Sequence, residues 1–199
     1  RAMMFAMEGN PWPNGGARWF AKDLSTGELR HISKRNNGTP SPFTSGYQAY
    51  GESANLMSAD GRYYAYASYD WQIDTAHPAL GSGLHSFVYD WDTDQSLLVE
   101  TNSAGQPVDN ASALKQITWN GRYVLMDMYG VNTGSAPAGA VQYEASYIKD
   151  LQTGTLSLIS VPGVPDTVTS PNAYRNPVSA IAISNDADIV IYRIYGQGS

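Results

Sequence analysis

The chain has 199 residues, of which 42% are hydrophobic and 15% carry a charge, and it has no cysteine. Disulfides, thiolate zinc sites and cysteine nucleophiles are therefore excluded. The net charge of −6 and the absence of a basic run argue against nucleic acid as a partner and give no sign of membrane binding.

The polar surface is built from Ser, Thr, Asn, Gln and Gly, since the charged share is well below the roughly 25% of a typical domain. Such residues favour turns and strands over helices. Short apolar stretches bounded by turn residues predict about 13 strands and no helix. In chain order, the expected strands are 1–7, 19–23, one containing His31, 54–58, 62–68, 87–90, one after the turn at 92–94, 114–118, 122–128, 147–150, 155–160, 179–184 and 188–194.

Two sequence blocks recur in phase. "SADGRYYAYAS" (58–68) matches "TWNGRYVLMDM" (118–128) and "SNDADIVIYRI" (184–194). A second block, "WFAKDLSTGEL" (19–29), matches "FVYDWDTDQSL" (87–97) and "YIKDLQTGTLSL" (147–158). Both blocks keep a period of about 60 residues, which predicts internal repeats. We place them at 1–61, 62–121, 122–187 and, in part, 188–199.

Each repeat is expected to form four antiparallel strands, called a to d, with tight a–b and c–d turns. These turns are attributed to Asp, Asn and Gly, which form tight turns readily. The predicted structural turn residues are Asp23, Asp60, Gly61, Asp90, Asn120, Gly121, Asp150 and Gly154.

These motifs resemble the TolB-like, or WD-like, β-propeller repeat, in which a Ser-x-Asp-Gly-(Lys/Arg) turn and an Asp-Leu-x-Thr-Gly turn flank apolar strands. The resemblance covers about three and a third repeats. It implies an all-β fold of four-stranded blades, and an incomplete one, because a propeller needs roughly four to eight blades to close. The rest of the propeller is expected to be missing from this chain.

The b–c and d–a connections are long, and in an antiparallel meander they leave from the same end of the blade. Loops placed by a rigid scaffold commonly carry function. We expect a protein, peptide or glycan to bind there. The candidate contacts are Trp12, Trp71, Asp74, His77, His85, Asp127 and Arg193. The alternative is that the tryptophans pack their own loops.

Several motifs do not carry chemistry. Asp90, Asp92 and Asp94 have calcium-loop spacing, but Gln95 and Thr101 stand where that loop needs Gly and Glu. Ser112 and Lys115 fit Ser-x-x-Lys, yet on a strand such residues face opposite ways. Two His near Asp74 have irregular spacing, so we predict no metal site and no cofactor.

Asp127 lies inside an apolar strand, where its repeat equivalents are Ala6, Ala67 and Arg193. A buried unpaired charge is costly. We expect Asp127 and Arg193 to pair between the third and fourth repeats or to face a shared polar pocket. The alternative is that each reaches water separately.

The sequence thus predicts a binding or scaffolding propeller module. The alternative is the propeller part of an enzyme, either the gating domain of a serine peptidase or a polysaccharide lyase, although the chain has no catalytic motif. Few Lys residues and many Ser, Thr, Asn and Tyr residues favour a periplasmic or secreted bacterial protein.

Overall fold

A computed structural model describes residues 2–7, 18–39, 41, 55–77, 83–108, 112–129, 132–134, 144–159 and 178–194. These residues form 12 strands in four small antiparallel sheets and no helix. The prediction of an all-β fold is confirmed.

The sheets follow one another along the chain. The first contains β1 (Ala2–Met7), β2 (Arg18–Asp23) and β3 (Leu29–His31). The second contains β4 (Tyr63–Ser68), β5 (His85–Asp90) and β6 (Gln95–Leu98). The third contains β7 (Ser112–Ile117), β8 (Tyr123–Tyr129), β9 (Glu144–Asp150) and β10 (Leu156–Leu158). The fourth contains β11 (Val178–Ile183) and β12 (Val190–Ile194).

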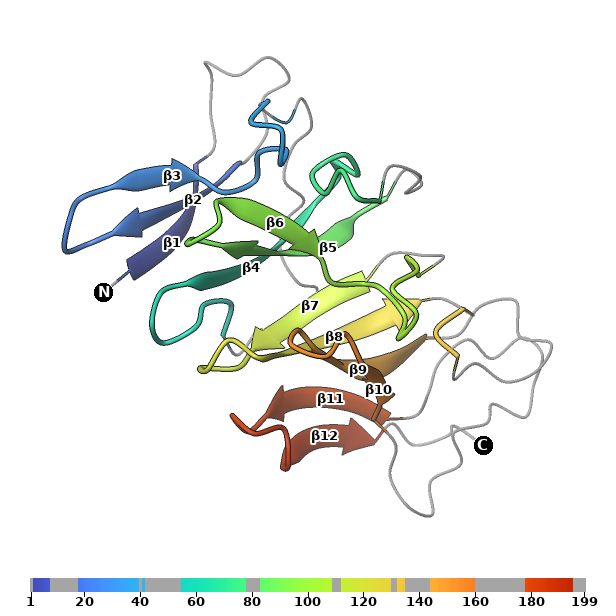
Figure 1. The fold of residues 1–199 in the computed structure, drawn as a ribbon. Helices are drawn as coiled ribbons and strands as arrows, with labels where there is room; N and C mark the ends of the chain where they lie inside the picture. The colour runs from blue at the N-terminus through green and yellow to red at the C-terminus, as the bar shows by residue number, and fades with distance from the viewer. Residues whose placement is uncertain are drawn as a thin grey trace.

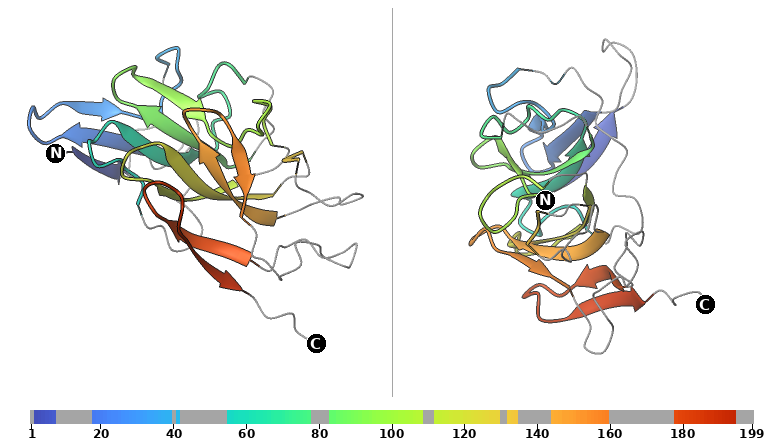
Figure 2. Two further views of the ribbon diagram at one scale, coloured as in Figure 1. Left: turned by 60° about the horizontal axis from the view of Figure 1, so that its bottom comes forward. Right: turned by 90° about the vertical axis from the view of Figure 1, so that its right-hand side faces the viewer.

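The four sheets lie side by side from the N-terminal to the C-terminal end of the chain (Figure 1), and further views show the same succession (Figure 2). The hydrophobic core lies between the sheets. One cluster joins Ala21 and Ile32 of the first sheet to Tyr64 and Phe87 of the second. Two more fill the next two boundaries. The sheets do not close into a ring, so the arrangement is that of an incomplete propeller.

The strand expected at 54–58 differs from the prediction. Asn55 bridges Gln116 of the third sheet, whereas Met57 bridges Tyr64 of its own sheet. The Asn55 carbonyl accepts the Ile117 N–H at 2.7 Å. The segment divides its backbone hydrogen bonds between two sheets and therefore forms isolated bridges instead of a regular strand.

The turns preserve the same interactions in successive sheets. Arg62 donates to both carboxylate oxygens of Asp90 at 2.9 and 2.8 Å, and its guanidinium lies 4.8 Å from the Tyr63 ring centre. Arg122 repeats this with Asp150, at 3.3 and 2.9 Å, and lies 4.8 Å from its neighbouring tyrosine ring. The two blocks thus match in side-chain contacts as well as in sequence.

The predicted turn residues cap or form their turns. Asp23 and Asp150 accept backbone N–H groups of the turns that they begin. Side-chain hydrogen bonds, from Ser25 to Asp23 and from Arg122 to Asp150, together with these N–H groups lower the pKa of each carboxyl to about 2. Asp60 and Asn120 each accept the N–H two residues ahead. Gly61, Gly121 and Gly154 have positive φ, as such turns require.

Two turns keep this conformation without glycine. Asp94 has φ 57° at the place held by Gly154 in the next repeat, and Ala187 has φ 63° at the place of Gly121. The turn 184–188 therefore survives the loss of its glycine, at the steric cost of a Cβ in the left-handed region.

Gly121 is constrained by more than its φ. A Cβ there would lie 2.3 Å from Cδ2 of Tyr63 in the preceding sheet, whereas a Cβ on Gly154 would have nothing within 4 Å. The two glycines share a left-handed backbone and differ in their surroundings.

Gly121→Ala is expected to lower the free energy of unfolding by about 3 kcal/mol, because it adds overpacking to backbone strain. Gly154→Ala is the matched control and should cost only about 1 kcal/mol. Urea denaturation of both variants measures the difference. Equal losses would show that the Tyr63 contact does not constrain the turn.

Candidate functional site at the loop end

The strands define two ends of the molecule. The tight turns lie at one end, on the left in Figure 1, and we call it the turn end. Three pairs of strand termini, Met7 with Arg18, Ser68 with His85 and Tyr129 with Glu144, lie in register at the other, which we call the loop end. The longer connections leave from these termini.

Residues 69–77 follow β4 at the loop end and are tied to the scaffold by two buried carboxylates. Asp70 is fully buried and pairs with Arg35, with N–O distances of 2.9 and 3.3 Å. Asp74 accepts the N–H of Leu98 at 3.1 Å and that of Ala76 at 2.9 Å. Asp74 thus orders its own loop and anchors it to β6.

The aromatic and imidazole candidates in this segment also contact the protein. Trp71 is half-buried and packs against the cluster between the first two sheets. His77 Nδ1 lies 3.0 Å from Asp74, and its Nε2 lies 3.3 Å from the Gly105 carbonyl. Tyr69, in the same segment, is 44% exposed. Trp12 falls outside the described residues.

His85 begins β5 and is buried. Its Nδ1 contacts Glu100, which is also fully buried and accepts the Ser86 N–H at 3.1 Å. This pair connects the start of β5 to the chain that leaves β6. His85 therefore lies at the predicted end of the molecule but beneath its surface.

Asp127 is bound within its own sheet. One carboxylate oxygen lies 2.6 Å from Nζ of Lys115, and the other accepts the Ser146 hydroxyl at 2.5 Å. Lys115 also donates to the Ser179 hydroxyl at 2.8 Å and to the Ala180 carbonyl at 2.7 Å. Ser146 in turn accepts the Ala180 N–H at 2.9 Å. The network joins β7, β8 and β9 to β11.

The ion pair of Asp127 is therefore with Lys115, not with Arg193 as predicted. Arg193 is exposed on β12, opposite Ser179 in register. Lys115 is available because the β7–β8 ladder shifts between Leu114 and Gln116, which makes Lys115 the extra residue of a bulge. The network reaches the fourth sheet through Ser179 and Ala180.

Sequence reasoning missed Arg35, Glu100 and Lys115. A signal existed for all three, since each is a charged residue where an equivalent repeat position is neutral. In the repeat, Lys115 corresponds to Asn55 and Ile181, and Glu100 corresponds to Ser33, so each is a charge where other repeats have a neutral residue. The same comparison drew attention to Asp127. Arg35 corresponds to Asn102 by the same offset, and both residues begin turns with the same backbone hydrogen bonds.

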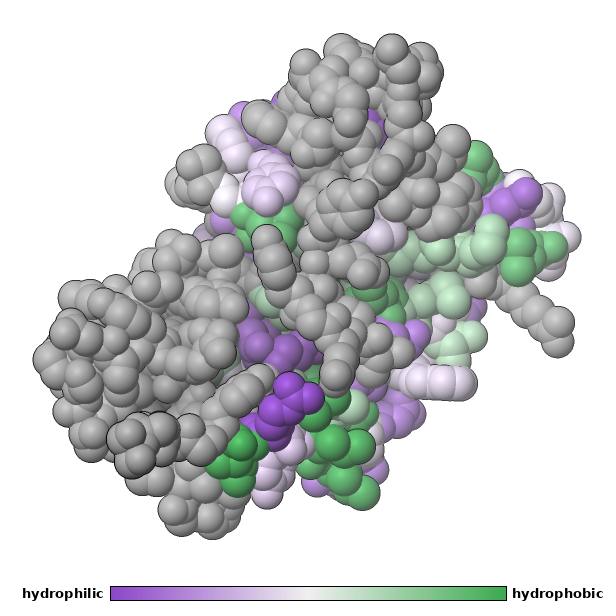
Figure 3. All heavy atoms as spheres, turned by 180° about the vertical axis from the view of Figure 1, so that it is seen from behind, coloured by the Kyte–Doolittle hydropathy of each residue, from purple (hydrophilic) through white to green (hydrophobic). Residues whose placement is uncertain are grey.

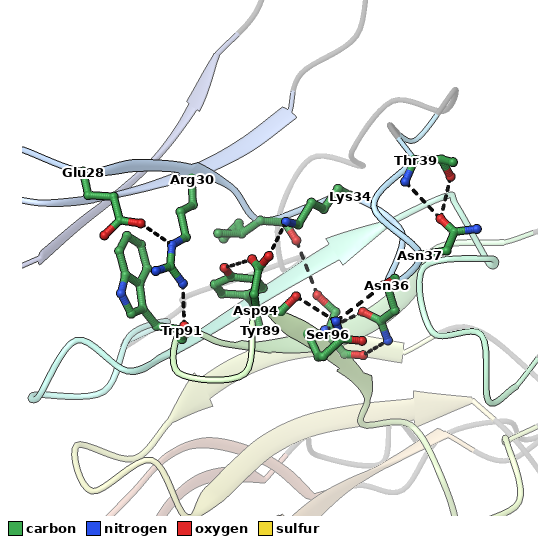
Figure 4. A network of polar contacts seen from close by, with 12 residues as sticks. Glu28, Arg30, Lys34, Asn36, Asn37, Thr39, Tyr89, Trp91, Asp94 and Ser96 are labelled. Atoms are coloured by element: carbon green, nitrogen blue, oxygen red, sulfur yellow. Dashed lines mark hydrogen bonds and ion pairs between the residues drawn. The ribbon is translucent and has the colours of Figure 1, made fainter.

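Further polar contacts join the first two sheets (Figure 4). Arg30 donates to the Trp91 carbonyl at 2.5 Å and lies 4.1 Å from its ring centre. Lys34 pairs with Asp94 at 2.6 Å. The Asn36 amide donates to the Ser96 carbonyl at 2.8 Å and accepts its N–H at 2.7 Å.

Burial lowers the pKa of two basic groups. Burial, reinforced by the charges of Arg18 and Lys34, lowers the pKa of His31 to about 4, so this imidazole is neutral near pH 7. Burial also lowers the pKa of Lys149, whose ammonium donates to Thr101, Asn102 and Gly154 oxygens between 2.7 and 3.3 Å. Lys149 thereby joins β9 to the segment that follows β6, whereas His31 stacks on Phe20 of its own sheet.

Among the described residues, no group of three or more His, Cys, Asp or Glu side chains is arranged to hold a metal ion. The same part of the chain has no helix of the length and apolar character that a membrane span needs.

No protein-family model matches the chain, and no curated protein matches it. Among solved structures, it is similar to TolB from Acinetobacter baumannii, with 15% identity and a TM-score of 0.45 over 100% of this chain and 41% of that one. It is also similar to a putative TolB from Agrobacterium tumefaciens, with 13% identity and a TM-score of 0.42 over 82% and 44%. The chain thus spans less than half of either protein.

The charge pair predicts a thermodynamic cycle. Lys115→Ile leaves Asp127 without its cation and is expected to cost about 2 kcal/mol of unfolding free energy. Asp127→Ala should cost a similar amount. The double variant, which copies Ile181 and Ala67 from other repeats, should lose less than the sum of the two.

Chemical denaturation of the four proteins measures the coupling energy. Strictly additive losses would contradict a direct Lys115–Asp127 interaction.

Proposed function

We propose that the chain is a binding module whose loop end contacts a protein, peptide or glycan. The observation that carries the proposal is the division of the molecule into two ends. Tight turns of repeated geometry occupy one end, and the variable connections leave from the other. Variable segments on a rigid scaffold are where binding residues concentrate.

The buried charges support a scaffold role for the strand ends. Asp70, Asp74 and Asp127 each have a cation or an imidazole together with hydrogen-bond donors as partners. These partners rigidify the strand termini from which the longer connections leave. A rigid base lowers the entropy cost of presenting a contact surface.

The exposed residues at the loop end provide the contact chemistry. Tyr69 offers an aromatic ring with a hydroxyl, a combination common in binding surfaces because it contributes apolar area and a hydrogen bond. His77 adds a partly exposed imidazole held by Asp74. Trp12 is proposed to join them. An extracytoplasmic site of action remains part of the proposal on the basis of composition.

Peptide and glycan arrays probed with the chain identify a ligand, whose affinity is then measured for three variants, Trp12→Ala, Tyr69→Ala and His77→Ala. We expect at least one of them to weaken binding about tenfold, as the loss of a central contact residue does. The matched control is Trp119→Ala, which removes a 66% exposed aromatic at the turn end.

The control should leave affinity unchanged. Loss of binding in Trp119→Ala, with the three loop-end variants unaffected, would move the site to the turn end and overturn the proposal. Far-ultraviolet circular dichroism of each variant separates loss of a contact from loss of the fold.

A further inference from the structure

Two turns at the turn end can be compared position by position. One joins β5 to β6 in the second sheet, and the other joins β9 to β10 in the third. Both lie within the described part of the chain, at residues 90–94 and 150–154. The turn end, at the right in Figure 3, presents hydrophilic side chains interspersed with hydrophobic ones. The two turns contribute to this surface with different side chains on the same main chain.

The main-chain hydrogen bonds of the two turns are equivalent. The Asp90 carboxylate accepts the Asp92 N–H at 3.0 Å, and the Asp150 carboxylate accepts the Gln152 N–H at 2.9 Å. In both sheets, the carbonyl of the arginine that precedes the neighbouring strand accepts an N–H of the turn at 2.8 Å. Gln152 therefore leaves the main chain at the same place in its sheet as Asp92 does.

In the second sheet, the arginine beside the turn binds two carboxylates. Nε and Nη2 of Arg62 donate to Asp90 at 2.9 and 2.8 Å. The remaining nitrogen, Nη1, lies 3.2 Å from Oδ2 of Asp92. All three nitrogen atoms of this guanidinium thus face a carboxylate oxygen.

In the third sheet, the equivalent arginine binds only one carboxylate. Nε and Nη2 of Arg122 donate to Asp150, whereas Nη1 has no hydrogen-bond or ion-pair partner among the described residues. Gln152 replaces the second aspartate, and its exposed side-chain amide makes no hydrogen bond in the same part of the chain. The Arg122 side chain is 42% exposed. One edge of the guanidinium therefore remains available to a ligand.

The two available groups suit a carboxylate. A guanidinium nitrogen and a side-chain amide nitrogen are both hydrogen-bond donors, and a carboxylate only accepts. Hydrogen bonds from a guanidinium to a carboxylate are among the strong ones, because both groups carry charge. Arg122 is already held in place by Asp150 and by the Tyr123 ring, whose centre lies 4.8 Å from its guanidinium carbon. The donor edge is thus oriented before any ligand arrives.

We propose that Arg122 and Gln152 form a contact site for the side-chain carboxylate, Asp or Glu, of a partner polypeptide. This carboxylate takes the place that Asp92 holds beside Arg62 in the second sheet. The site is at the turn end and is separate from the contacts proposed for the loop end. An exposed charge pair adds little affinity, so the site selects among partners more than it holds one by itself.

Two tripeptides with blocked, uncharged termini test the proposal, Gly-Asp-Gly and its neutral match Gly-Asn-Gly. In a titration followed by nuclear magnetic resonance, Gly-Asp-Gly should shift the Arg122 Nε–H and the Gln152 side-chain amide signals to saturation. We expect the neutral peptide to bind about fivefold more weakly, as the loss of one exposed charge pair implies. Equal shifts with both peptides, or no shift with either, would overturn the proposal.

The two repeats provide matched variants. Gln152→Asp copies Asp92 and supplies an internal carboxylate, so it should abolish the response of Arg122 to Gly-Asp-Gly. Asp92→Gln copies Gln152 and should open an equivalent site at Arg62, so that the chain binds two peptides instead of one. Each variant introduces a residue that the other repeat accommodates, and far-ultraviolet circular dichroism checks that the fold is kept. Unchanged binding in Gln152→Asp, or no response of Arg62 in Asp92→Gln, would contradict the assignment.

Discussion

The arrangement of the sheets depends on hydrogen bonds that cross from one sheet to the backbone of the next. Ile117 and Ile183 occupy equivalent inner-strand positions. The Ile117 N–H donates to the Asn55 carbonyl, and its C=O accepts the Asn55 amide. The Ile183 N–H and C=O are bound by the Gln116 side-chain amide at 2.9 and 3.0 Å. In each case a residue of the preceding sheet satisfies two main-chain groups that no strand of their own sheet reaches.

This constraint explains why polar residues occur where a packed core is expected. A buried main-chain group without a partner is costly, so each boundary between apolar sheets needs donors and acceptors at fixed places. At the boundary of the first two sheets, the Asn36 side-chain amide likewise donates to the Ser96 carbonyl and accepts the Ser96 N–H. Lys115 and Lys149 satisfy carbonyl groups at two later boundaries. The apolar clusters supply the buried surface between sheets, and the polar residues determine the position of each sheet relative to the next.

The repeated elements were predictable, and the exceptions were predictable only in part. The Arg62–Asp90 and Arg122–Asp150 contacts follow from two sequence blocks that keep one phase, because equivalent positions in a repeat have equivalent neighbours. Asp127 was correctly identified as a departure from its repeat. Its partner was not, because Lys115 reaches it through a bulge of β7 that recurs at the equivalent Ile181 of β11 and cannot be read from the apolar pattern of the strand. The apolar pattern also did not predict that the segment 55–57 would bridge two sheets instead of forming a regular strand.

The candidate residues of the loop end illustrate a second limit. The sequence identifies Asp74, His77 and His85 as polar residues of a connection, but it does not show in which direction their side chains point. The structure uses Asp74 and His85 to tie the loop end to the scaffold, through Leu98 and Glu100, and leaves Tyr69 exposed. Whether a carboxylate faces solvent or a buried N–H depends on distant segments that the repeat does not describe.

Amide hydrogen exchange at Ile183 tests the central claim, that side-chain amides of one sheet hold the backbone of the next. In Gln116→Leu, exchange of the Ile183 N–H should accelerate about tenfold, in line with the loss of about 1.4 kcal/mol from one buried hydrogen bond. The Ile117 N–H, held by the Asn55 carbonyl, should keep its protection. Unchanged protection of Ile183, or an equal loss at both amides, would contradict the account.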